Sequence, residues 1–98
     1  MARSLSHLIS PVEKIALIVD NEPDIAAGAR VLKQVGFECR LARSVEDAIP
    51  LVRSHKLVLV PSDINPLDGR NGYELARYVR ERSPLTPVIL MSRYHRVN

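Results

Sequence analysis

Apolar residues are spaced in two different ways along the chain, and the change from one spacing to the other separates predicted strands from predicted helices. The segment KIALIVD, at 14–20, is a short and nearly unbroken apolar run, which is typical of a strand covered on both faces. Similar runs at 57–60 and 87–92 predict two more buried strands. The segment FECRLA, at 37–42, alternates apolar and polar residues instead, which predicts a strand at a sheet edge with one wetter face.

The segment that follows the first strand has the spacing of an amphipathic helix, with apolar residues every three or four positions. Pro23 suits a first helical turn, and Gly36 is typical of the position just beyond a helix end. We therefore expect a helix between these two residues. Its inward stripe is predicted to consist of Ile25, Ala29, Leu32 and Val35.

Two further helices are predicted from their start and stop signals. Ser44, with Asp47 three residues later, resembles a capping box that opens a helix. Pro50 lies inside this helix and predicts a kink or a short, broken helix. The last helix follows Gly72 and ends before Pro84. Its inward face is predicted to carry Leu75, Ala76 and Val79.

Strands that alternate with helices predict an α/β fold in which right-handed crossovers build a parallel sheet. In the doubly wound strand order 2-1-3-4, strands 1 and 3 lie side by side, and ligands gather beyond their carboxyl ends. Asp20 ends the first strand and Asp63 ends the third. We therefore expect both carboxylates at one mouth of the sheet, although Pro61 is unusual in a central strand.

Length and composition limit the protein to one folded domain. The chain has 98 residues, of which 46% are hydrophobic and 26% charged, a composition typical of a globular protein. We expect a flexible tail at 1–12 and the domain at 13–98. Because no apolar run is long enough for a signal peptide or a membrane span, we expect a cytoplasmic protein. The single cysteine, Cys39, excludes an intrachain disulfide and suits a reducing compartment.

The charge pattern argues against a direct nucleic-acid surface. The net charge is only +3, and the basic residues are scattered along the chain. Arg77, Arg80 and Arg82 lie on the last helix with Glu74 and Glu81 among them, so we interpret them as a solvated helix face. The three histidines have no spacing that would suit zinc.

The acids at the strand ends form a candidate metal site. Carboxylates that meet in a partly buried crevice repel one another and lose hydration, unless a cation compensates. Oxygen ligands favour Mg²⁺ or a similar hard ion. The candidate ligands are Asp20, Asp63, Glu22 and the backbone carbonyl of Asn65. The pattern alone leaves open a second interpretation, in which these acids are only turn and helix-cap residues.

Three stretches, LIVDNEP, SDINPLDGRNGYELAR and PVILMS, occur in an order and spacing that resembles the receiver domain of bacterial two-component response regulators, over residues 13–95. The resemblance implies a flavodoxin-like fold and a signalling phosphoacceptor that is not an enzyme. In that family a phosphoryl group passes from a phosphohistidine of a sensor histidine kinase or phosphotransfer protein to an aspartate. By position, the resemblance implies Asp63 as the phosphoacceptor, Asp20 as an acid near Mg²⁺, and Ser92 as the hydroxyl that contacts the phosphoryl group.

Several features depart from the family pattern. Asn21 stands where the family usually has a second acid, and Arg93 stands where it mostly has alanine or glycine. The sequence also stops before the family's fifth strand, its lysine and its fifth helix, so an incomplete domain is expected whose apolar fourth strand invites a homodimer or strand exchange. These departures keep a second hypothesis open: a degenerate receiver that acts as a phosphorylation-independent interaction or dimerisation module.

Overall fold

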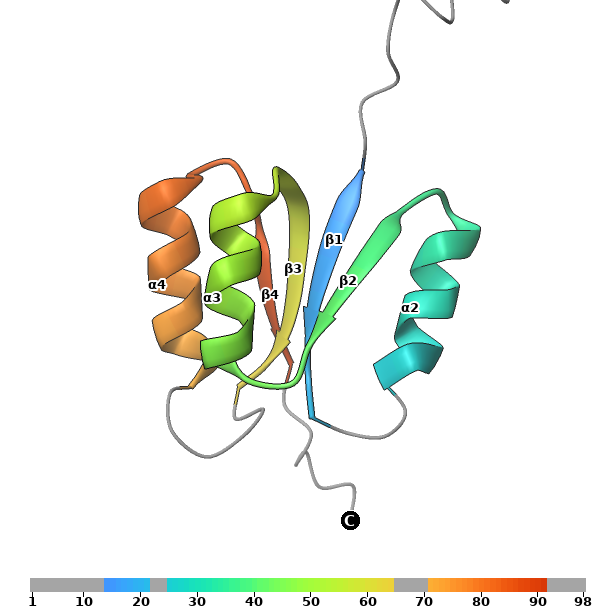
Figure 1. The fold of residues 1–98 in the computed structure, drawn as a ribbon, viewed down its shortest axis with the longest axis horizontal. Coiled ribbons are helices and arrows are strands. Elements are labelled where there is room, and N and C mark those ends of the chain that lie inside the picture. The colour runs from blue at the N-terminus through green and yellow to red at the C-terminus, as the bar shows by residue number, and fades with distance from the viewer. Residues whose placement is uncertain (1–13, 22–24, 65–70, 92–98) are drawn as a thin grey trace, which may run out of the picture.

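The computed structural model describes residues 14–21, 25–64 and 71–91, which form four strands and three helices. Figure 1 shows the strands side by side, with all their arrows pointing to the same end of the sheet. In chain order the elements are β1 (Ile15–Val19), α2 (Ile25–Gln34), β2 (Glu38–Ala42), α3 (Val45–Ser54), β3 (Leu57–Asp63), α4 (Gly72–Arg82) and β4 (Val88–Met91). The predicted tail at 1–12 lies outside the described residues.

The strand order in the sheet is β2-β1-β3-β4, and every neighbouring pair is parallel. Parallel neighbours require crossover connections, which α2, α3 and α4 supply. The predicted α/β fold and its doubly wound strand order are therefore confirmed. Within the described residues, β2 and β4 form the two edges of the sheet.

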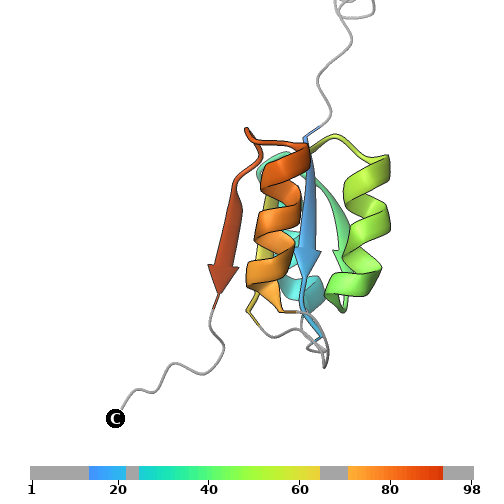
Figure 2. The same cartoon turned by 90° about the vertical axis from the view of Figure 1, so that its left-hand side faces the viewer.

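The helices form two unequal layers. α3 and α4 pack against each other on one face of the sheet, whereas α2 contacts β1 and β2 on the other face. Figure 2 looks onto the face that α3 and α4 cover, with α2 behind the sheet. Across the described ranges, the structure contains no helix whose length and apolar character would suit a membrane span.

The main core lies between the sheet and the layer of α3 and α4. All five residues of β1 are buried, as expected for a strand that is covered on both faces. Alternate residues of β1 point to each face, and those on the α3 and α4 side join the main apolar cluster. The most completely buried apolar side chains of this cluster are Leu17, Val19, Val45, Val60, Leu75 and Val79.

α2 ends where the sequence predicts, but its inward stripe is shorter than expected. Gly36 has a φ of 102°, a left-handed conformation that favours glycine. The amides of Gly36 and Phe37 donate to two carbonyls of the last helical turn, which is the usual bonding of a glycine-terminated helix. The prediction that Val35 faces inward is wrong: its side chain is 65% exposed, because it lies after the last helical residue, where the chain is already turning.

α3 is continuous through Pro50, so the break expected there does not occur. The helix begins as predicted at Ser44, whose hydroxyl accepts a hydrogen bond from the Asp47 amide at 3.0 Å. A proline inside a helix costs roughly 3 kcal/mol. Pro50 is exposed, and the buried face of α3 carries Val45 and Val52, whose packing on the sheet offsets that cost.

β3 runs through Pro61 to Asp63, beyond the predicted end of this strand. The amides of Val60 and Ile64 donate to carbonyls of the β4 segment, so alternation along the strand directs the missing amide of Pro61 toward β1. Pro61 still pairs through its Cα with Ile89 of β4. A central strand tolerates this proline because it loses a donor on one side only.

β4 is not the buried strand that its apolar sequence predicts. Ile89 is 49% exposed and Met91 is 37% exposed, whereas Val88 and Leu90 are half-buried on the opposite side. The register pairs Ile89 with Pro61, on the face of the sheet that α2 covers only over β1 and β2. Position at the edge, and not composition, therefore decides the exposure of β4.

Candidate functional site

Two buried carboxylates stand at the carboxyl end of the sheet. Asp63 is the last residue of β3, and Asp20 directly follows β1. Asp63 is only 6% exposed and Asp20 only 7%. Aspartates are rarely so buried unless a partner compensates their charge, so this pair is the leading candidate site in the described part of the chain.

The register of the sheet brings the two acids together. Val19 and Ser62 are Cα partners across the parallel pair β1 and β3, so the residues that follow them, Asp20 and Asp63, are next to each other. Neighbouring strands are about 4.8 Å apart, and alternation directs both side chains to the same face. The Asp20 amide donates to the Ala42 carbonyl at 2.9 Å, which keeps the end of β1 attached to the end of β2.

The backbone of Asp63 is held from two sides. The buried Ser62 hydroxyl donates to the Asp63 carbonyl at 2.9 Å. Gly72 packs so closely that an added Cβ would lie 2.6 Å from the same carbonyl oxygen, and its amide donates to the carbonyl of Ile64. The start of α4 therefore rests directly on the backbone of the acid, and only glycine fits this contact.

A complete capping box fixes the start of α4 beside the site. The Asn71 side chain accepts from the Glu74 amide at 3.1 Å, and the Glu74 carboxylate accepts from the Asn71 amide at 3.1 Å. Sequence reasoning placed the helix directly after Gly72, whereas the helix begins at Gly72, and it missed the cap at Asn71. The spacing of Asn71 and Glu74 is the signal that would have found it.

A cation that sequence reasoning missed lies at the same end of the sheet. The Arg43 guanidinium, just after β2, donates to the Asn21 carbonyl at 3.4 Å. Asn21 is half-buried and follows Asp20 directly. The contact therefore links the ends of β1 and β2 and places a positive charge at the rim of the acidic pair. The rule that ligands gather at strand ends, applied to β2 as well, would have found Arg43.

The donor chemistry of the pair fits a hard divalent cation. Two carboxylates on adjacent strand ends repel each other, and a bound cation relieves that repulsion. Carboxylate oxygens are ligands that Mg²⁺ prefers. Among residues 14–21, 25–64 and 71–91, no third histidine, cysteine or acid completes a cluster with them. The other predicted site residues, Glu22, Asn65, Ser92 and Arg93, lie outside the described residues.

Cys39 is not a candidate nucleophile. Its thiol lies in β2 and donates to the Ala29 carbonyl of α2 at 3.6 Å. Burial raises the pKa of the Cys39 thiol above its ordinary value, although Lys33 and Arg40 oppose this effect. Since the thiolate is the reactive form, a raised pKa favours a packing role for this side chain.

The family model of the response regulator receiver domain matches residues 16–98 of this chain. Two similar proteins come from Pseudomonas aeruginosa. The response regulator protein PilR is 36% identical over 80 residues, which cover 81% of this chain and 18% of PilR. The response regulator protein FleR is 33% identical over 85 residues, which cover 87% of this chain and 18% of FleR. The chain thus spans less than a fifth of either relative.

Solved structures show the same architecture. The response regulator TrrA from Thermotoga maritima, in complex with Mg²⁺ and BeF, has a TM-score of 0.75 and 32% identity, with 83% of this chain and 70% of that one covered. A receiver domain protein from Methanospirillum hungatei has a TM-score of 0.78 at 22% identity, with 88% of this chain and 69% of that one covered. The second similarity concerns the fold alone.

Proposed function

The chain belongs to the response regulator receiver domain family, and from this premise we propose that Asp63 accepts a phosphoryl group with the help of Mg²⁺, which Asp63 and Asp20 would hold. The observation that carries this proposal is the pair of buried carboxylates at the ends of two adjacent parallel strands. The pair stands where this fold gathers its ligands.

The phosphoryl donor is a phosphohistidine of a sensor histidine kinase or of a phosphotransfer protein. A carboxylate oxygen of Asp63 forms a bond to phosphorus while the bond between phosphorus and the donor imidazole nitrogen breaks. The electron pair of the broken bond stays on the imidazole nitrogen. The product on this chain is an acyl phosphate. The leaving imidazole takes up one proton from water, or already carries it on its other ring nitrogen, and so departs as a neutral imidazole.

The residues around the pair position the acceptor for this step. The contacts of Ser62 and Gly72 hold the Asp63 backbone, so the carboxylate turns about its own side-chain torsions only. A bound Mg²⁺ supplies the positive charge that screens the acceptor carboxylate from the phosphoryl oxygens. Asp20, with Glu22 and the carbonyl of Asn65, would hold that ion. Ser92 is proposed to contact the phosphoryl group and to move with it.

Labelling with a small phosphodonor tests the proposal. We expect the chain to gain one phosphoryl group when it is incubated with acetyl phosphate and Mg²⁺, as seen by intact mass spectrometry. Removal of Mg²⁺ with a chelator should abolish the gain, because the two carboxylates then repel the donor. Borohydride reduction followed by peptide mapping should locate the acyl phosphate at Asp63.

Two matched variants decide which carboxylate reacts. Asp63→Asn should remove the labelling, and Asp20→Asn should raise the Mg²⁺ concentration needed for it. Asp47→Asn removes an exposed acid from the first turn of α3 and should leave labelling unchanged. Labelling that survives in Asp63→Asn, or that is absent from the parent chain at saturating Mg²⁺, would overturn the assignment.

A second candidate function is favoured by the residues beside Asp20. Asn21 lacks the charge that the family pattern usually has there, and its carbonyl is occupied by Arg43. Such a receiver would act as a phosphorylation-independent interaction module, paired with a second copy along the edge of β4, where Ile89 and Met91 are exposed. This function predicts no labelling and a dimer that Mg²⁺ does not change. Sedimentation of the parent chain and of Ile89→Lys, with and without Mg²⁺, separates the two candidates.

A further inference from the structure

The carboxyl ends of β2, β1 and β3 each carry a charged side chain, and the register of the sheet places these three side chains in one row. One residue of each strand is in register across the three strands: Ala42, Val19 and Ser62. The residues that follow them are Arg43, Asp20 and Asp63. Neighbouring strands are about 4.8 Å apart, so Arg43 starts from a position beside Asp20, on the side away from Asp63.

The side chain of Arg43 is directed to the same face of the sheet as Asp20. Ala42 and Val19 belong to the main apolar cluster under α3 and α4. Because successive side chains of a strand point to opposite faces, Arg43 and Asp20 are both directed to the face of α2. The guanidinium of Arg43 donates to the Asn21 carbonyl at 3.4 Å, which shows that it reaches over the end of β1.

The backbone of Arg43 is fixed on both sides. The Ala42 carbonyl accepts from the Asp20 amide at 2.9 Å. On the other side, Ser44 is the buried cap of α3, and its hydroxyl accepts from the Asp47 amide at 3.0 Å. The guanidinium therefore extends from a fixed point at the end of the sheet, although Arg43 itself is exposed.

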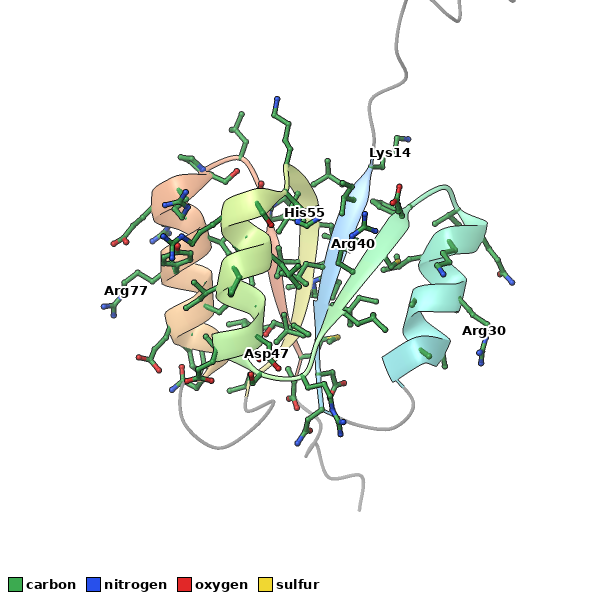
Figure 3. All side chains as sticks on the ribbon, viewed as in Figure 1. Lys14, Arg30, Arg40, Asp47, His55 and Arg77 are labelled. Carbon is green, nitrogen blue, oxygen red and sulfur yellow. The ribbon has the colours of Figure 1, made fainter. Side chains whose placement is uncertain are left out.

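The charge of Arg43 is not offset by the acids of α3. Glu46 and Asp47 lie in the first turn of this helix, where they are favourable to the helix dipole. Figure 3 shows Asp47 at the end of α3 that lies toward the carboxyl end of the sheet. In the described part of the chain, neither of these acids forms an ion pair with Arg43. The buried carboxylate next to the cation in the row is that of Asp20.

We propose that Arg43 sets the affinity of the acidic pair for Mg²⁺. This inference rests on the proposed function, in which Asp20 and Asp63 would hold the ion. The two carboxylates bring two negative charges, Asn21 adds none, and the guanidinium offsets one of the two. Because like charges repel, Arg43 makes the site less attractive to a divalent cation. Arg43 acts through its charge and is not itself a ligand, so the site fills at higher Mg²⁺ concentrations than the acidic pair alone would need.

Direct titration with Mg²⁺ tests this role. Binding is followed in the 98-residue chain through the amide NMR signals of Asp20 and Asp63. Arg43→Gln removes the charge and keeps a hydrogen-bond donor for the Asn21 carbonyl. We expect this variant to bind Mg²⁺ about threefold more tightly than the parent chain at about 0.1 M ionic strength. Arg43→Lys keeps the charge, so its affinity should lie within about 1.5-fold of the parent.

Two controls separate local charge from other effects. Arg53→Gln makes the same change in net charge in the last turn of α3, at the end that His55 marks in Figure 3. It should change the Mg²⁺ affinity by less than about 1.5-fold, because α3 is longer than the Debye length of about 10 Å. In about 1 M salt, the effect of Arg43→Gln should also fall below about 1.5-fold. Circular dichroism checks folding, and Arg43→Met replaces Arg43→Gln if the latter does not fold.

Each possible failure has its own signature. Equal Mg²⁺ affinity in the parent and in Arg43→Gln would overturn the role of Arg43 and leave the proposed function standing. Equal gains in Arg43→Gln and Arg53→Gln would mean an effect of net charge alone and would also overturn it. Equal gains in Arg43→Gln and Arg43→Lys would overturn it in favour of the lost contact with Asn21. Absence of Mg²⁺ binding from the parent and from Arg43→Gln would overturn this role together with the Mg²⁺ part of the proposed function.

Discussion

The two faces of the sheet are built from the same mostly apolar strands, yet they are packed very differently. The face under α3 and α4 holds the main core, where Leu75 and Val79 are fully buried. On the other face, Ala29 is the buried apolar side chain among the described side chains of α2, and Val31 of the same helix is 60% exposed. All three helices are amphipathic, so the difference comes from which strands they cover. α2 contacts β1 and β2. On the same face of the sheet, Ile89 and Met91 of β4 remain exposed.

The candidate site lies at the border between the well-packed layer of α3 and α4 and the thinly packed layer of α2. Asp63 is anchored through Gly72 and Ser62 to the side that holds the core. Asp20 directly follows β1, which α2 covers on the thinly packed side. The two acids therefore lie between a side with many buried apolar contacts and a side with few. Regions with few buried apolar contacts are those that open and move most easily.

The largest difference in stability is expected when one leucine is truncated in each helical layer. Leu75→Ala, in α4, should lower the free energy of unfolding by about 3 kcal/mol, because it removes a fully buried side chain and leaves a cavity. Leu32→Ala, in α2, should lower it by about 1 kcal/mol, since this residue is half-buried. Urea unfolding measures both values. Leu85→Ala, at a 96% exposed position, is the control and should change little. Equal losses at Leu75 and Leu32 would contradict the unequal layers.

Glycine-to-alanine substitutions should have opposite signs in the two layers. Gly72→Ala should destabilise the protein by about 2 kcal/mol, because its Cβ would lie 2.6 Å from the Asp63 carbonyl oxygen. Gly28→Ala, inside α2, meets nothing within 4 Å and should stabilise the protein by up to about 1 kcal/mol. Thermal unfolding followed by circular dichroism reads both changes. If Gly72→Ala left the stability unchanged, the start of α4 would be free to shift away from the site.

The turn between α4 and β4 provides a smaller test of the well-packed side. The buried Thr86 hydroxyl donates to the Leu57 carbonyl at 2.8 Å and also contacts the Ser83 hydroxyl at 2.9 Å. Thr86→Val keeps the shape and removes the donor, so it should cost about 1.5 kcal/mol in urea unfolding. Ser54→Ala removes an exposed hydroxyl that contacts His55, and its effect should fall within about 0.5 kcal/mol. A comparable loss in both variants would argue against burial as the cause.

The smallest effect is expected at the β2 edge. Glu38 and Arg40 form an ion pair of 2.9 Å whose side chains are 51% and 35% exposed. Glu38→Gln should change the free energy of unfolding by less than about 0.5 kcal/mol, because water and salt screen exposed pairs. Repeating the measurement in high salt should remove even this difference. A loss above about 1 kcal/mol that persists in salt would show that the edge is more rigid than its exposure suggests.

Local signals in the sequence were enough to predict the kinds of element, their order and the parallel sheet, because apolar spacing, glycines and cap residues act over a few neighbouring residues. The sequence also determined that Asp20 and Asp63 end adjacent strands, since the doubly wound order follows from the alternation of strands and helices.

The exposure of Val35, Ile89 and Met91 could not be predicted, because it depends on where each helix ends and which strands it covers, and not on the residue's own character. The same holds for the contact of Gly72 with the Asp63 carbonyl and for the meeting of Arg43 with Asn21. Each joins residues of different elements, beyond the reach of a helix or strand repeat, so no local pattern encodes it. Arg77 and Arg80 are visible in the sequence as residue types, but the groove that they line forms only once α4 lies beside β4.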